Sequence, residues 1–188
     1  MGLSIAIWLL AVPLAHAEGI QVKMAELVSA DEVYHINADL EITFNETLEE
    51  ALKKGVQLHF VTSFELLRPR SFLGLDFVRP LFSWADESIA SVERHSKLSY
   101  NALIRQYQLA NGSQLQNFGS LSEALQELAK IREWQVVDRS LIKKRYNYQA
   151  SLRMKLDVSQ LPKPIQVSAI GSKAWNLESE WFRWTLIP

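Results

Sequence analysis

The sequence has no cysteine among its 188 residues, so it can form no disulfide and offers no thiol nucleophile. It has only seven glycines, and they do not form a glycine-rich motif of the kind that binds phosphate groups. The sequence therefore gives no support for nucleotide binding. Lysine and arginine number 20 against 21 aspartates and glutamates, whereas a nucleic-acid-binding domain normally carries a basic excess. These shortages argue against thiol catalysis, nucleotide chemistry and a nucleic-acid partner.

Histidine is scarce as well. After the first 17 residues the chain has His35, His59 and His95, and no two of them have the close spacing of a zinc motif. His35 and His59 fall on the polar faces of expected strands, where antiparallel pairing could bring them together. A solvated histidine explains each position more simply, so we predict no metal and no cofactor.

Catalytic motifs are missing too, because no Gly-x-Ser-x-Gly turn is present to expose a serine. Three carboxylate pairs could be considered as the acid and base of a glycosidase: Glu49 with Glu50, Asp86 with Glu87, and Asp39 with Glu41. A helix dipole explains the first pair and a solvated strand face the last. We predict no catalytic residue and a non-enzymatic protein.

An almost wholly apolar run extends from Leu3 to Leu14, and Ala15-His16-Ala17 follows it as a small-x-small cleavage site. About a dozen apolar residues are too few to span a bilayer comfortably. We predict a signal peptide over residues 1–17, cleaved after Ala17, and an exported protein of the periplasm or cell envelope. The segment has no lysine or arginine, so the alternative is an uncleaved apolar anchor. No cysteine follows that could carry a lipid.

Period-two alternation dominates the rest of the chain. Between Tyr34 and Phe44 every second residue is apolar, and the residues between them are polar; the run from Tyr146 to Leu156 repeats the pattern. Successive side chains of a strand point to opposite faces, so each run predicts an antiparallel strand with one buried face. A helix would require a period near 3.6.

Eight further strands are predicted, over residues 20–28, 56–67, 89–100, 102–109, 114–118, 134–137, 165–170 and 181–187. In the last of these, Phe182, Trp184 and Leu186 should face the core and Trp181 the solvent. Asn111-Gly112 between two runs is a strong hairpin signal. Ten strands are more than one flat sheet holds easily. We therefore predict a single domain over residues 18–188, a mainly β antiparallel sandwich of immunoglobulin-like character with two short α-helices.

The two helices are predicted from capping signals. Asn45 precedes an acidic first turn, Leu48 and Leu52 share one face, and Gly55 ends the helix. Ser120 and Glu123 form a capping box before Leu121, Leu125 and Leu128. Both helices should close an end of the sandwich or bridge its edges.

Several segments together resemble the DUF4390 family of exported proteins from Gram-negative bacteria. They are Gly55-Val56, Phe64-Glu65-Leu66 with Arg68-Pro69-Arg70, Leu98 to Leu103 with Arg105-Gln106-Tyr107, Leu161 to Pro164, and Trp175-Asn176-Leu177 with Trp184. The resemblance covers nearly the whole mature chain. It implies an envelope protein with a hint of envelope signalling, and it supplies no site residue. The chain departs from the family pattern at residues 71–87, where the apolar loop is longer.

That loop is the sequence's candidate contact surface, because its many apolar residues show no clean period. It either packs against its own sheet, binds a protein partner or a second copy, or touches a membrane surface with its arginines on phosphates. The candidate interaction residues are Arg68, Arg70, Phe72, Phe77, Arg79, Phe82, Trp84 and, from the last strand, Trp181.

Two classes of function remain. The first is a protein-interaction module that binds an unknown envelope protein or itself. The alternative is a carrier or sensor that holds an apolar small ligand between its sheets, which a cavity lined by Tyr146, Tyr148 and Met154 would favour. An enzyme of unrecognised type is the least supported interpretation.

Overall fold

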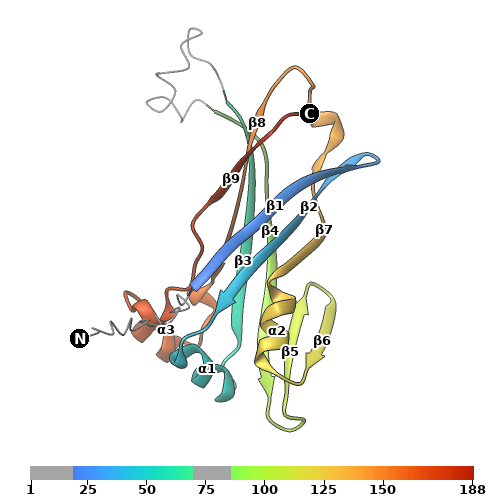
Figure 1. Cartoon of the computed structure of the whole chain (residues 1–188). Coiled ribbons are helices and arrows are strands. Elements are labelled where there is room, and N and C mark those ends of the chain that lie inside the picture. The colour runs from blue at the N-terminus through green and yellow to red at the C-terminus, as the bar shows by residue number, and fades with distance from the viewer. Residues whose placement is uncertain (1–18, 70–85) are drawn as a thin grey trace, which may run out of the picture.

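The computed structural model describes residues 19–69 and 86–188. Its strands form two antiparallel sheets (Figure 1). Sheet A has three strands in the order β1 (Gly19–Ala30), β2 (Val33–Thr43) and β7 (Lys130–Asp138). Sheet B has six strands in the order β6 (Gln114–Phe118), β5 (Gln106–Asn111), β4 (Glu87–Asn101), β3 (Leu58–Arg68), β8 (Tyr148–Leu156) and β9 (Phe182–Leu186). Sheet A lies across sheet B, so the predicted antiparallel β-sandwich is confirmed.

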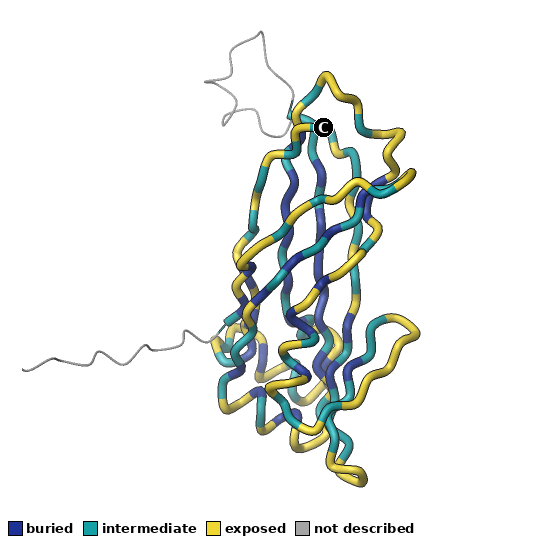
Figure 2. The backbone as a smooth tube through the Cα atoms, turned by 45° about the vertical axis from the view of Figure 1, so that its right-hand side comes forward, coloured by how far each residue is buried: buried dark blue, intermediate teal, exposed yellow. Residues whose placement is uncertain are grey.

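The alternating runs form strands because their apolar face is the core of the sandwich. In β2, Tyr34, Ile36, Ala38 and Leu40 are buried, and the residues between them are not. In β8 the buried set begins at Tyr148 and includes Leu152 and Met154. Figure 2 shows this alternation as short buried stretches along both sheets. Burying a large apolar side chain contributes about 1.5–3 kcal/mol, so these two strands supply much of the core.

Both predicted helices are present with the caps expected for them. In α1 (Glu46–Lys53), the Asn45 side chain accepts a hydrogen bond from the Leu48 N–H at 3.0 Å, and Leu48 and Leu52 are buried. In α2 (Leu121–Leu128), Ser120 and Glu123 form the complete capping box. Helix α1 closes one end of the sandwich, and α2 lies along the edge of sheet A (Figure 1).

The expected strand over residues 165–170 is wrong, because this segment forms a third helix, α3 (Lys163–Ala169). Pro162 and Pro164 suit the first turn of a helix, and a short apolar run does not distinguish helix from strand. Val167 is 77% exposed instead of buried. The described residues also form three short 3₁₀ helices: η3 (Arg139–Leu141), η4 (Val158–Gln160) and η5 (Lys173–Trp175).

The expected strand over residues 102–109 is also shortened at its start. Residues 102–105 form the turn between β4 and β5, and Arg105 has a φ of 54°. Leu103 is 95% exposed at this turn, so its apolar character reflects no core position. The described part of the chain therefore has nine strands where ten were expected. Within the same residues, no helix is long and apolar enough to cross a lipid bilayer.

Candidate functional site

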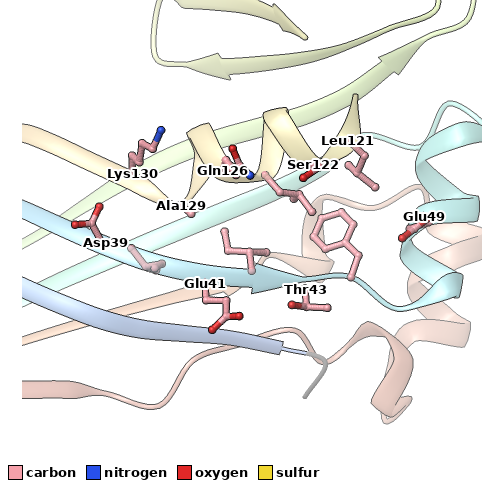
Figure 3. Close-up of a pocket in the computed structure, with 13 residues that line it drawn as sticks. Asp39, Glu41, Thr43, Glu49, Leu121, Ser122, Gln126, Ala129 and Lys130 are labelled. Atoms are coloured by element: carbon pink, nitrogen blue, oxygen red, sulfur yellow. The ribbon is translucent and has the colours of Figure 1, made fainter. Parts of the chain in front are cut away.

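A cavity of about 710 Å³ lies between strand β2 and helix α2 and is called here the β2–α2 groove (Figure 3). The second half of β2 forms its floor, α2 forms one wall, and α1 reaches its far end. Its lining residues are Asp39, Leu40, Glu41, Ile42, Thr43, Phe44, Glu49, Leu121, Ser122, Leu125, Gln126, Ala129 and Lys130.

The groove exists because the pairing between β2 and β7 stops before β2 ends. The last paired residues are Asp39 and Lys130, and the Leu40 N–H then donates to the Ala129 carbonyl at 2.9 Å. Alternate residues of a strand direct their peptide groups to the same edge, so the N–H and C=O of Ile42 also point toward α2. Among the residues described, no strand pairs with Ile42 on this side. The sheet edge is therefore open beside the helix.

The walls next to this open edge are apolar. Leu40 and Phe44 project inward from β2, and Leu121 and Leu125 project from one face of α2. Leu121 and Leu125 are only partly buried, in contrast to Ala124 and Leu128 beside them on the same face of α2, which are buried in the core. Ser122 and Gln126 form the exposed rim one helical turn apart. The groove thus combines peptide hydrogen-bonding groups with an apolar surface.

The acidic side chains of the groove have basic partners. Asp39 is bound by Arg132, whose guanidinium also donates to the Ala38 carbonyl at 2.7 Å. Glu41 forms an ion pair with Lys23 at 2.6 Å. Glu49, on α1, lies 3.5 Å from the ammonium of Lys53.

Lys130 differs from these groups, because no ion pair joins it to any residue that the structure describes. It lies at the end of the groove where β7 begins, and Glu49 lies at the opposite end (Figure 3). Within the part of the chain that the structure describes, the groove therefore has the unpaired ammonium of Lys130 at one end and the solvent-accessible carboxylate of Glu49 at the other.

Of the residues predicted from the sequence as a contact surface, only two fall within the described ranges. Arg68, at the end of β3, forms an ion pair with Glu87 and packs over the Tyr146 ring at 4.6 Å. Arg145 contacts the same ring at 4.7 Å. Arg70, Phe72, Phe77, Arg79, Phe82 and Trp84 lie outside the described residues.

Trp181 lies far from Arg68. The guanidinium of Arg153 packs over the Trp181 ring, 4.6 Å from the ring centre. Trp181 is half-buried, whereas the sequence predicted that it faces the solvent. Arg153 pairs in register with Ser63, which is five residues before Arg68 and hence about 17 Å away along β3. Trp181 lines a smaller cavity of about 280 Å³ at the start of β1. The structure does not bring the two residues into one surface.

His35 and His59, which antiparallel pairing could have brought together, also lie apart. His35 is in sheet A and His59 in sheet B, so the two histidines do not pair. Partial burial, with a contribution from Lys97, lowers the pKa of His59. No group of three metal-ligating side chains occurs among the described residues.

The three residues predicted to line an apolar ligand cavity do not line the groove. Tyr148 and Met154 are core residues, and Tyr146 is also absent from the lining of the groove.

Sequence reasoning missed the groove. It assigned Asp39 and Glu41 to a solvated strand face, which is correct for the strand alone. The capping box located α2, but no sequence signal showed that its half-apolar face would lie beside the end of β2.

Comparison with known families explains the resemblance noted in the sequence. The family model described as a domain of unknown function, DUF4390, matches residues 17–185. The chain belongs to the DUF4390 family. In this DUF4390 domain the match includes both sheets and the β2–α2 groove. Searches of curated proteins and of solved structures give no match.

Proposed function

We propose that this protein is a non-enzymatic protein-interaction module, exported to the periplasm or cell envelope, that binds an extended peptide segment in the β2–α2 groove. The observation that carries the proposal is the open edge of β2 at Ile42 beside the apolar face of α2. Peptides that add a strand to a sheet gain affinity from main-chain hydrogen bonds and specificity from pockets for alternate side chains. The groove offers both.

The charges of the groove also favour binding over catalysis in this proposal. Each of its three carboxylates has a cation within ion-pair distance, so none is positioned as an isolated proton donor or acceptor. Paired charges at the rim contribute little energy but discourage unsuitable partners.

A second candidate is the binding of an apolar small molecule in the same groove. The volume of about 710 Å³ lies within the range of about 300–1,000 Å³ that small-molecule sites occupy. The open strand edge favours the peptide, because a small apolar ligand would leave the peptide groups of Ile42 without partners.

Peptide binding can be tested by selecting random displayed decapeptides on the purified protein. Selected peptides should shift the amide resonances of Glu41, Ile42 and Thr43 and of residues on α2. A Ser122→Trp variant should weaken binding at least tenfold, because the indole would fill the groove from its rim. Gln116→Trp, at an exposed position of β6, is the matched control and should bind normally.

Three other outcomes would redirect this proposal. If an apolar naphthalene dye binds in a Ser122-dependent manner and no peptide does, the small-molecule function is supported instead. If peptides are selected but bind the Ser122→Trp variant normally, the groove is not their site. Loss of binding in a Phe77→Ser, Phe82→Ser double variant of unchanged stability would then assign contact to the loop predicted from the sequence.

Export is proposed from residues 1–17, which lie outside the described residues. The protein expressed with its native N-terminus in a Gram-negative host should be recovered from the periplasm with Glu18 as its first residue. N-terminal sequencing and fractionation measure both properties. Recovery of the intact N-terminus in the membrane fraction would support the anchored alternative.

A further inference from the structure

The end of the groove at Ala129 and Lys130 is closed to a continuing strand. Ala129 occupies the position opposite Leu40, since its carbonyl accepts the Leu40 N–H, and β7 begins directly after it. A segment that pairs with Ile42 can therefore extend only as far as the position opposite Glu41. There it must end or leave the sheet.

The side-chain direction of such a segment follows from β2. Residues directly opposite each other in an antiparallel pair project to the same face. Ile42 projects inward and packs against the core. The residue opposite Ile42 would consequently enter the apolar space between Phe44 and Leu125, whereas its two neighbours would face the solvent.

The charges at the two ends determine the direction of the segment. At the closed end, Asp39 is bound by Arg132, whereas the ammonium of Lys130 has no ion-pair partner among residues 19–69 and 86–188. That end therefore suits a carboxylate better than an amine. At the open end Glu49 already pairs with Lys53 at 3.5 Å, but its side chain is 41% exposed, so its carboxylate can accept a second cation. A carboxyl terminus at Lys130 requires the segment to run antiparallel to β2.

We propose that the groove binds the carboxyl-terminal end of a partner protein, antiparallel to β2. Its terminal carboxylate binds Lys130, its penultimate residue is apolar and lies opposite Ile42, and a basic residue two positions earlier faces Glu49. This inference rests on the proposed function, and it specifies which peptides the groove accepts.

The probe is the pentapeptide acetyl-Gly-Lys-Thr-Leu-Ser with a free carboxyl terminus, compared with the same peptide as its carboxyl-terminal amide. Dissociation constants follow from titrations that monitor the amide resonance of Ile42. The acid should bind at least tenfold more tightly than the amide. Lys130→Gln should reduce the affinity for the acid to that for the amide. Lys144→Gln, which removes an exposed lysine outside the groove, should change neither value.

Equal affinity of acid and amide, with no effect of Lys130→Gln, would overturn the carboxyl-terminal specificity and leave peptide binding in the groove intact. Tighter binding of the reversed peptide with a free amine and a blocked carboxyl group would overturn the direction. If neither these probes nor the selected decapeptides shift the Ile42 resonance, the proposed function fails together with this inference.

Discussion

A Leu48→Asp variant is expected to be unfolded in buffer at 25 °C. Leu48 is completely buried on the inner face of α1, where that helix closes the sandwich. A carboxylate at this position would have no charged partner in the core and would cost several kcal/mol, in addition to about 2 kcal/mol of lost apolar burial. Domains of this kind have a total stability of about 5–15 kcal/mol. Near-ultraviolet circular dichroism and thermal melting would measure the loss.

The matched control is Val167→Asp, because Val167 is also an apolar helical residue but lies at the surface of α3. That change should alter the free energy of unfolding by less than about 1 kcal/mol. A Leu48→Asp variant that melts cooperatively near the wild-type temperature would show that α1 does not seal the core.

Leu152→Ala should reduce the free energy of unfolding by about 2–5 kcal/mol. Leu152 is fully buried in β8, where it is paired in register with Phe64 of β3 and Phe182 of β9. Removing its three outer carbons leaves a cavity that the central strands of sheet B have little freedom to fill. A denaturant titration should show a lower midpoint with an unchanged slope.

Leu115→Ala is the control for the same chemical change, because Leu115 is 60% exposed on β6. Its expected loss is below about 0.5 kcal/mol. Ser151 would be a poor control: it points away from Leu152, as its place in the alternating run predicts, but it is only 4% exposed. Equal losses for Leu152→Ala and Leu115→Ala would mean that the inner face of β8 is wrongly assigned.

The sequence predicted those elements whose structure depends on nearby residues. Strand β2 was predicted because its buried and solvated residues alternate along one continuous run. Helix α1 was predicted because Asn45 and Leu48 interact within a single turn. The segment at residues 165–170 was misassigned because α3 leaves Val167 exposed, and so it lacks the buried apolar face that the strand interpretation assumed.

The groove could not be predicted in this way, since it depends on contacts between distant parts of the chain. Arg132 neutralises Asp39 across 93 residues of sequence. The pairing of β7 with β2 stops at Lys130, directly after the end of α2, and the sequence of β2 does not indicate this point. The alternation in β2 therefore predicted which side chains of the strand are buried, but it did not indicate that the edge of β2 beside α2 is open.

Helix α2 serves the core and the groove with different residues, and this separation has a consequence for how the family can diverge. Ala124 and Leu128 are buried and contribute to folding, whereas Leu121, Ser122, Leu125 and Gln126 line the cavity. Leu121 and Leu125 also pack against the core, so Ser122 and Gln126 are the lining residues of α2 that evolution can vary freely while the fold is conserved. Members of the family could therefore present different side chains from α2 at the rim of the groove without loss of the fold that supports it.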